Sequence, residues 1–298
     1  MRFGIFRSSL LSLAAWVFMG CGSVSTEAKA PATKRDVAER RSPAPAPRSS
    51  EDAAPQTLVR ASFETSAFAL KPGSKFWLVA RFEIHDGYRI SWKNPGDVGK
   101  PTVARFSAPE GFVVSEVRYP RPRRFVLNGE LVSYGYQDQT ALFAEVEVPE
   151  GLGEHTPYRF ELDAEWYACK KECASERTNA FFELLVDEAA PRTAMDDSLE
   201  ALLETVPVPV STLGKAVHRW QQEGSETELS LSAPKVEWLD FYPARPEVPK
   251  LLRVSGSKKE LRLSFQAPDE PPAMLEGVAI AKVDGAEATF DVELPWGK

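Results

Sequence analysis

The stretch "YRFELDAEWYACKKEC", residues 158–173, decides the fold. Apolar and charged residues alternate along its first part, so that one face carries only apolar side chains and the other carries only charged ones. The apolar row is Tyr158, Phe160, Leu162, Ala164 and Trp166, and the charged row is Arg159, Glu161, Asp163 and Glu165. A period of two over this length is typical of an antiparallel strand with one buried face and one wet face. The stretch therefore predicts a β-sheet protein.

Most of the remaining chain after residue 56 shows the same kind of pattern. Strand-like runs, punctuated by proline and glycine at intervals typical of a β-sandwich, are "KFWLVARFEI" (75–84), "ALFAEVEVP" (141–149), "TELSLSA" (227–233), "KVEWLDFYP" (235–243), "LLRVSG" (251–256), "ELRLSFQAP" (260–268), "LEGVAIAKV" (275–283) and "ATFDVELP" (288–295). The period changes in "MDDSLEALLETVP" (195–207), where leucines at helical spacing predict a helix that Pro207 ends. A second short helix is expected from Ser211 to about Gln222. We expect two all-β modules, residues 57–190 and 223–298, joined by a helical connector at 191–222.

Cys169 and Cys173 follow the alternating strand, separated only by "KKE". Cys169 has the parity of the charged row, which predicts a solvent-facing position. If the strand turns at "KKE", the two cysteines face each other about 4.5 to 5.5 Å apart at Cα, a separation that a disulfide accepts. A ring of about five residues stabilises a fold by only ~2 kcal/mol in the chain-entropy estimate, which makes it a poor brace. Reversible redox chemistry, a structural disulfide and a metal site all stay open at this point.

Other chemistries find little support in the sequence. His85, His155 and His218 are far from the cysteines in the chain, so a complete Cys/His metal site is not expected. No hydrolase or phosphate-binding motif is present, and the net charge of −7 offers no basic surface for nucleic acid. We therefore expect no metal, no cofactor and no nucleic-acid partner.

The N-terminal residues point to export. Two arginines and a short apolar run precede "FMGC" (18–21), which resembles the signal of a bacterial lipoprotein with Cys21 as the lipidated residue. Residues 1–20 are then the signal peptide. Residues 21–56 are rich in Ala, Pro, Ser and charge, a composition typical of a disordered tether. The expected location is the periplasm-facing side of a bacterial membrane, the outer membrane being favoured, with a lipid anchor.

Four motifs occur in a characteristic order: "ISWKNPGDVGKPT" (90–102), "RRFVLNGELVSYGYQ" (123–137), "ALFAEVEVP" and "WYACKKEC". Together they resemble the periplasmic N-terminal domain of the thiol:disulfide interchange protein DsbD, in the group of disulfide-bond corrector proteins. The runs "VEWLDFYP" and "LEGVAIAKV" with "ATFDVELP" resemble the second β-module of larger members. The resemblance implies an immunoglobulin-like β-sandwich at residues 57–190, followed by a smaller β-module.

The resemblance also implies a function and a site. Cys169 and Cys173 match a redox pair that takes electrons from an integral-membrane donor and passes them to periplasmic thioredoxin-like or disulfide-isomerase clients. Phe125 and Tyr134 fall in the segment that caps the pair in this family, and Trp166 and Tyr167 flank it. The sequence ends at Lys298, before any membrane or thioredoxin-like domain of the full-length relatives, so we expect a separate polypeptide as donor. The chain is thus interpreted as a thiol:disulfide oxidoreductase. The alternatives are a scaffold lipoprotein with an inert disulfide and a Cu(I)-binding protein.

Overall fold

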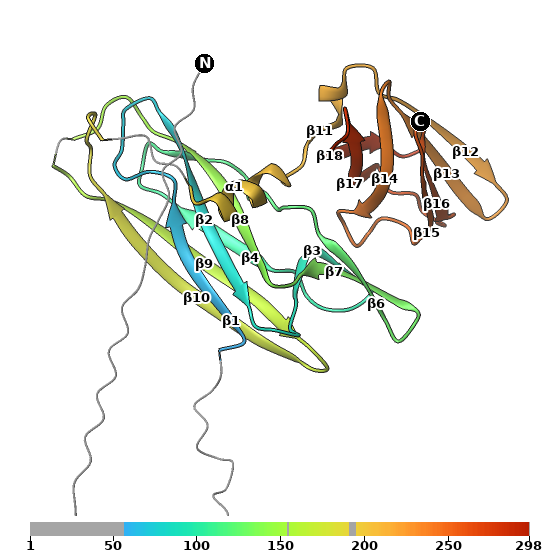
Figure 1. The fold of residues 1–298 in the computed structure, drawn as a ribbon, viewed down its shortest axis with the longest axis horizontal. Coiled ribbons are helices and arrows are strands. Elements are labelled where there is room, and N and C mark those ends of the chain that lie inside the picture. Colours follow the sequence, from blue (N-terminus) through green and yellow to red (C-terminus); the bar gives the residue numbers. More distant parts are fainter. Residues whose placement is uncertain (1–56, 154, 191–194, 298) are drawn as a thin grey trace, which may run out of the picture. The chain divides into compact units, whose positions relative to one another are not determined.

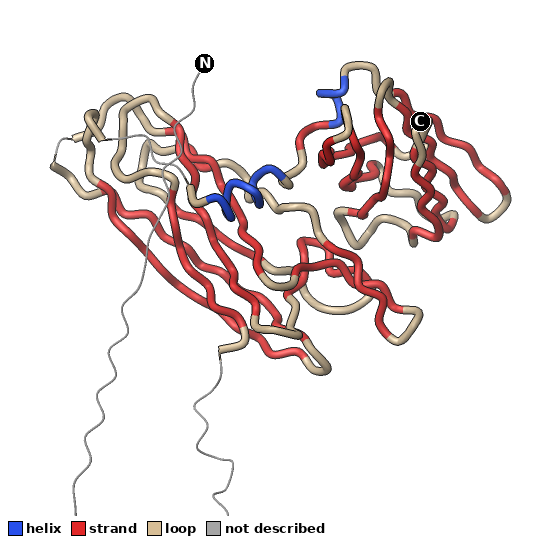
Figure 2. The backbone as a smooth tube through the Cα atoms, viewed as in Figure 1, coloured by secondary structure: helices blue, strands red, loops and turns tan. Residues whose placement is uncertain are grey.

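The computed structural model describes residues 57–153, 155–190 and 195–297, which all belong to one compact unit, Ala54–Lys298 (Figure 1). The expected signal peptide (1–20), the lipidation site at Cys21 and the expected tether (21–56) lie outside these described residues. Strands make up most of the described chain, as Figure 2 shows in red, and the all-β prediction is confirmed. None of the described helices is long and apolar enough to cross a membrane.

The first module contains three antiparallel sheets, in the strand orders β1-β2-β8-β5, β10-β9-β4 and β3-β7-β6. Its strands are β1 (Val59–Thr65), β2 (Lys75–Ile84), β3 (Ile90–Gly96), β4 (Val103–Ser107), β5 (Val113–Val114), β6 (Arg123–Leu127), β7 (Leu131–Tyr136), β8 (Gln139–Glu147), β9 (Tyr158–Cys169) and β10 (Cys173–Leu184). The first two sheets contribute most of the apolar core, and the third adds Ile90, Trp92 and Tyr136 to it. The third sheet contains most of the motifs at 90–102 and 123–137.

The alternation in β9 becomes the buried face of its sheet. Phe160, Leu162, Ala164 and Trp166 are all at most 2% exposed, as the sequence pattern predicts. They pack against the opposite sheet, where the ring of Phe160 meets that of Phe76 on β2 edge-on at 5.4 Å between centroids. Edge-to-face pairs of this kind stabilise a core beyond the burial of their area. The long ribbon of β9 and β10 is therefore held firmly along its length.

A short helix, α1 (Asp197–Glu204), covers the outer face of β2 and β8. Asp196 caps it, because its side chain accepts the backbone N–H of Leu199 at 2.9 Å. Leu199 is buried with Val79 and Phe143, which point away from the sandwich core. The sheet of β2 and β8 is thus buried on both faces, and this explains why Val79 is apolar on the parity that the alternation assigns to solvent.

The second module contains two four-stranded sheets, in the orders β11-β18-β17-β14 and β12-β13-β16-β15. Its elements are β11 (Val208–Pro209), the 3₁₀ helix η2 (Val210–Leu213), β12 (Val217–Glu223), β13 (Glu226–Ser232), β14 (Val236–Pro243), β15 (Leu251–Gly256), β16 (Leu261–Gln266), β17 (Met274–Val283) and β18 (Ala286–Pro295). Trp238, Phe241 and Phe265 fill the core of this module.

The helix expected from Ser211 to Gln222 is wrong. Only Val210–Leu213 forms a 3₁₀ helix, and Val217–Glu223 is strand β12. The reason is long-range pairing: β12 runs antiparallel to β13 along its whole length, from Val217 opposite Ser232 to Glu223 opposite Glu226. The second module consequently begins before residue 223.

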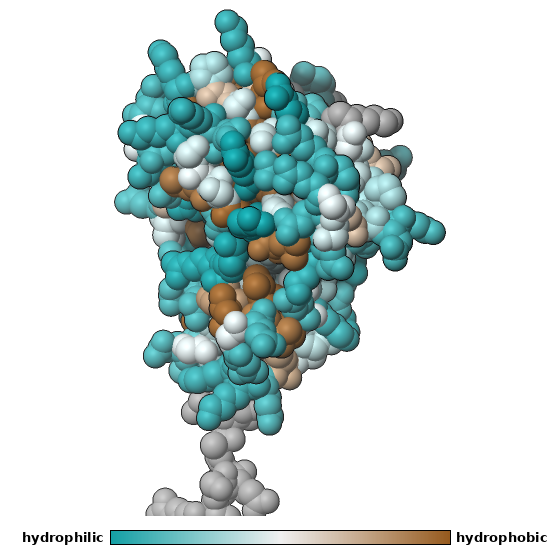
Figure 3. Space-filling model, turned by 90° about the vertical axis from the view of Figure 1, so that its right-hand side faces the viewer, coloured by the Kyte–Doolittle hydropathy of each residue, from teal (hydrophilic) through white to brown (hydrophobic). Residues whose placement is uncertain are grey.

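On the face shown in Figure 3, hydrophobic residues form small groups within a mostly hydrophilic surface. Such scattering is normal for the surface of a folded domain, because polar atoms do not suffice to cover it.

Candidate redox site at the end of the β9–β10 hairpin

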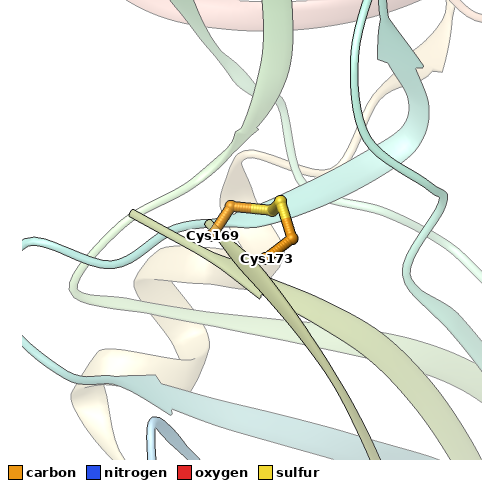
Figure 4. The surroundings of a disulfide bond; sticks show 2 residues. All are labelled: Cys169 and Cys173. Carbon is orange, nitrogen blue, oxygen red and sulfur yellow. A yellow bond between two sulfur atoms is a disulfide. The ribbon is translucent and has the colours of Figure 1, made fainter. Parts of the chain in front are cut away.

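Cys169 is the last residue of β9 and Cys173 the first of β10, and the two are directly paired across the hairpin. Their sulfurs form a disulfide with an S–S distance of 2.04 Å and a Cα–Cα distance of 4.1 Å (Figure 4). Lys170, Lys171 and Glu172 form the loop, in which the N–H of Lys170 donates to the carbonyl of Glu172 at 3.0 Å. The expected three-residue hairpin loop is confirmed.

The two cysteines differ in exposure. Cys173 is exposed, whereas Cys169 is only 6% exposed. The parity rule therefore failed for Cys169, where a segment from elsewhere in the chain joins the sheet. Arg89 pairs with Cys169 through two backbone hydrogen bonds, of 3.0 and 2.9 Å. One sulfur of the disulfide thus belongs to an exposed residue and the other to a buried one.

Arg89 also brings an aromatic ring to this end of the hairpin. Residues directly opposite each other in an antiparallel pair project to the same face, so Arg89, Cys169 and Cys173 share a face. The Arg89 guanidinium carbon lies 5.8 Å from the centroid of the Phe125 ring on β6. The structure thus connects the half-buried Phe125 to the cysteine face through Arg89.

Three other side chains bring charge and polarity to the cysteine face. Lys170, in the hairpin loop, lies 5.3 Å from the ring centroid of Tyr88. Tyr167 lies two residues before Cys169 and therefore on its face, and its hydroxyl accepts a hydrogen bond from Lys100 Nζ at 3.1 Å. That hydrogen bond from Lys100 lowers the pKa of Tyr167. Positive groups of Arg89, Lys170 and Lys100 are therefore close to this end of the ribbon.

The remaining expected site residues point elsewhere. Trp166 lies on the opposite face of β9, where it is 2% exposed, contacts Phe82 and donates from Nε1 to Glu176 Oε2 at 2.9 Å. Tyr134 is directly opposite Arg124 on β6, not opposite Phe125, and its buried ring packs edge-on against Tyr242 of the second module. Of the four flanking aromatics, Tyr167 lies on the cysteine face, Phe125 is linked to that face through Arg89, and Trp166 and Tyr134 point away from it.

Sequence reasoning did not identify Arg89, Tyr88 or Lys100. Arg89 directly precedes the motif "ISWKNPG", but no spacing rule connects it to a cysteine 80 positions later. These three residues flank β3 in the sequence, and they reach the cysteine end of β9 because β3 contacts β9 in the fold. For metal chemistry, no group of three or more His, Cys, Asp or Glu side chains with metal-binding geometry occurs among the described residues.

Comparison with known proteins agrees with this geometry. Residues 56–184 match the family model described as thiol:disulfide interchange protein DsbD, N-terminal, while no curated protein matches the chain. Among solved structures, the N-terminal periplasmic domain of ScsB from Proteus mirabilis is similar, with 14% identity, a TM-score of 0.54, and coverage of 80% of this chain and 92% of that one. Spo0M, a sporulation control protein from Bacillus subtilis, covers as much of this chain at 9% identity, but its TM-score of 0.22 carries no argument.

The similarity to the ScsB domain concerns the fold, because the identity is low. It confirms the immunoglobulin-like β-sandwich architecture expected for the first module, and it extends over most of the chain. The family resemblance rests on the family model and on the hairpin that carries the cysteine pair. Over residues 56–184, this chain is similar to the N-terminal domain of the thiol:disulfide interchange protein DsbD.

Proposed function

We propose that this protein passes electrons through Cys169 and Cys173, from an integral-membrane donor to disulfide-bonded clients in the periplasm. The observation that carries the proposal is the disulfide at the end of the β9–β10 hairpin, with Cys173 exposed and Cys169 buried, in a domain similar to the N-terminal domain of DsbD. The clients are of the thioredoxin-like or disulfide-isomerase class. No cofactor takes part, because thiols and disulfides exchange directly.

Loading begins at the exposed sulfur. A donor thiolate attacks Sγ of Cys173, the Cys169–Cys173 bond breaks, and Cys169 leaves as a thiolate. A second donor thiolate then attacks the donor sulfur of this mixed disulfide. The donor becomes a disulfide and Cys173 is released as a thiolate, so that two electrons have entered this domain. Lys170 and Lys171 in the hairpin loop favour the thiolate forms electrostatically and Glu172 opposes them, since charge close to a sulfur acts on its anion.

Delivery to the client proceeds by the same chemistry. The Cys173 thiolate attacks the client disulfide, forms a mixed disulfide and expels one client thiolate. The Cys169 thiolate then attacks Sγ of Cys173, which restores the Cys169–Cys173 bond and expels the second client thiolate. The client takes up two protons and ends as a dithiol. Cys173 is the nucleophile in this scheme because it is the exposed residue, and Cys169 resolves the intermediate.

The small ring supports reversible use of the bridge. It connects residues only four positions apart, so its removal costs the fold about 2 kcal/mol by the chain-entropy estimate. The two sheets of the first module are held together by their apolar core, as in the Phe76–Phe160 pair, and not by this bridge. We infer that the domain stays folded in both redox states.

The aromatic ring of Phe125 limits access to the pair in this proposal. Phe125 stacks on Arg89, whose backbone is bonded to Cys169, so a shift of this ring uncovers the buried side of the disulfide. Tyr134 is left out of the cap, because it packs against the second module.

Single replacement of each cysteine tests the relay. In the native host, Cys169→Ser should accumulate a mixed disulfide with a partner through Cys173, visible on a non-reducing gel and dissolved by reductant. Cys173→Ser should accumulate far less, because the remaining thiol is buried. The partner is identified by mass spectrometry of the excised adduct.

A double Cys169→Ser, Cys173→Ser variant is the matched control, and any adduct that persists in it involves Cys21 or another contact. Absence of adducts from both single variants contradicts the relay and supports an inert bridge. Stoichiometric binding of Cu(I) by the reduced protein, with loss of adducts when copper is added, supports the metal-binding alternative instead.

A further inference from the structure

The β6–β7 hairpin has two faces that contact different parts of the protein. Arg124 is directly opposite Tyr134, and Phe125 is directly opposite Ser133. Since opposite residues share a face and successive residues alternate, Arg124 and Tyr134 lie on one face and Phe125 on the other. The Phe125 face meets Arg89 at the redox site. The β6–β7 hairpin therefore lies between the redox site and the part of the protein that Arg124 contacts.

Arg124 contacts β14 of the second module in three ways. Its Nη2 donates to Asp240 Oδ1 at 2.8 Å and to the carbonyl oxygen of Phe241 at 3.0 Å. Its guanidinium carbon lies 5.2 Å from the ring centroid of Tyr242, which also receives the ring of Tyr134 edge-on at 5.6 Å. Burial opposes the charge of Arg124, but Asp240, Tyr134 and Tyr242 together outweigh it, and the pKa of Arg124 is raised. One side chain thus makes an ion pair, a hydrogen bond and a cation–π contact.

The backbone of β14 is irregular where Asp240 is located. The pairing of β14 with β17 shifts register between Trp238 and Asp240, as in a β-bulge. Bulges bend a strand and redirect its side chains. The Asp240 carboxylate is also fixed locally, because Oδ1 accepts the N–H of Phe241 at 2.8 Å. The acceptor for Arg124 is therefore oriented before the two modules meet.

We propose that Arg124, Asp240 and Tyr242 form a latch by which the second module holds Phe125 over the redox pair. The inference rests on the proposed function, since it takes Phe125 as the cap. Arg124 and Asp240 are positioning residues: they touch neither sulfur and act through the hairpin. The second module then controls how readily a partner reaches Cys169 and Cys173, and a partner that competes for Asp240 or Tyr242 opens the site.

A second ion pair between the modules provides a matched control. Arg121 Nη1 lies 2.5 Å from Glu287 Oε2 on β18, and the Arg121 side chain is 32% exposed against 31% for Arg124. Arg121 precedes β6 and is not part of the hairpin. Loss of this pair weakens the contact between the modules without loosening the latch.

The test is the alkylation rate of the reduced pair in the full chain. A Cys21→Ser background leaves Cys169 and Cys173 as the only thiols, because the sequence has three cysteines. With a bulky maleimide, Arg124→Ala and Asp240→Asn should each react about tenfold faster, the effect expected for loss of hydrogen bonds to a charged group. Iodoacetamide, which is small, should react at a nearly unchanged rate. The double variant should react no faster than either single one, since both remove the same interaction.

The Arg121→Ala control distinguishes the latch from a general loosening of the two modules. It should leave both rates unchanged. An equal acceleration in Arg121→Ala overturns the latch, because general loosening then suffices. Unchanged maleimide rates in Arg124→Ala and Asp240→Asn also overturn it, if Phe125→Ala still accelerates the reaction.

Two further variants separate failure of the latch from failure of the cap and from failure of a variant to fold. If Phe125→Ala has no effect, the cap itself fails and the latch with it, while adducts trapped in Cys169→Ser still support the relay. Arg124→Lys covers the case in which Arg124→Ala does not fold: it should react at an intermediate rate, since lysine keeps the charge but loses the planar fork.

Discussion

Cys169 and Cys173 face each other across one hairpin, yet only Cys173 is exposed. The two also differ in their backbone partners, because Arg89 is hydrogen-bonded to Cys169 on the side away from β10. The same Arg89 lies against Phe125. A single arginine therefore connects the backbone of Cys169 to the proposed cap.

Truncation of the Phe125 side chain should make the reduced cysteines react faster with maleimide and should leave the fold unchanged. In Phe125→Ala, loss of the ring over Arg89 should raise the maleimide rate of the reduced pair about tenfold, because a half-buried cation–π contact of about 1.4 kcal/mol is lost. The rate is measured by mass spectrometry of the Cys173 peptide, and the fold by circular dichroism.

Phe181→Ala is the matched control for this change. Phe181 on β10 also stacks on an arginine, since Arg159 lies 3.8 Å from its ring centroid, but it is paired with Glu161, eight residues from Cys169. Its removal should not alter the maleimide rate. Equal rates in Phe125→Ala and the unmodified protein would remove the β6–β7 hairpin from the redox site.

Helix α1 is short, and the contacts of Asp196 at its N-terminus fix where it begins. The Asp196 side chain accepts from Ser198 Oγ and from the Leu199 N–H, and it pairs with Arg81 on β2. These contacts, the Ser198 hydrogen bond first, lower the pKa of Asp196 to about 2. The cap thus both starts the helix and attaches it to the sheet that it covers.

The low pKa of Asp196 predicts a pH-dependent stability. Because the folded-state pKa lies below the ordinary value of 3.8, the charged carboxylate stabilises the fold above about pH 4, and this contribution disappears as the pH falls towards 2. Asp196→Asn keeps a capping oxygen but cannot titrate, so its stability deficit relative to the unmodified protein should shrink over that range. Asp196→Ala should cost about 1 kcal/mol at pH 7 through loss of the cap. Urea unfolding measures both, and a deficit of Asp196→Asn that is constant between pH 7 and pH 2 contradicts the assignment.

Sequence periodicity predicts most of the strands and helix α1, but it does not predict which distant segments pack against them. β2, β9 and β15 occupy the ranges in which the sequence alternates, and the leucines of 195–207 form α1. Residues 217–223 do not form the predicted helix, because β13 recruits them as a strand. The pairing of Arg89 with Cys169 and the Arg124–Asp240 contact are likewise long-range, across 80 and 116 positions. Periodicity reports which face of an element is apolar, not which distant segment covers that face.

The whole chain combines two β-modules with an N-terminal region that predicts a lipid anchor. A net charge of −7 argues against electrostatic attraction of the protein to anionic lipid. We therefore propose that membrane attachment depends on Cys21 and on residues 21–56 as a tether that gives the redox site access to both donor and clients.

Cys21→Ser should release the protein from the membrane fraction of the native host into the soluble fraction, because the modification that anchors it is lost. Fractionation followed by immunoblotting measures the distribution, and mass spectrometry of the N-terminal peptide detects the lipid directly. Variants at Cys169 provide the control, since they remove a cysteine without removing the anchor. Membrane association that persists in Cys21→Ser would show that the modules or a partner anchor the protein.

The pairing of Cys169 with Cys173 across so short a loop has a kinetic consequence. After a partner has bonded to Cys173, Cys169 is still held opposite it by the β9 backbone and by Arg89. Its effective concentration at the mixed disulfide is that of an intramolecular group, far above the concentration of any free thiol in the compartment. The covalent intermediate with a client should therefore have a short lifetime, and the client should depart as soon as it is reduced, whereas with the donor the same attack by Cys169 competes with loading.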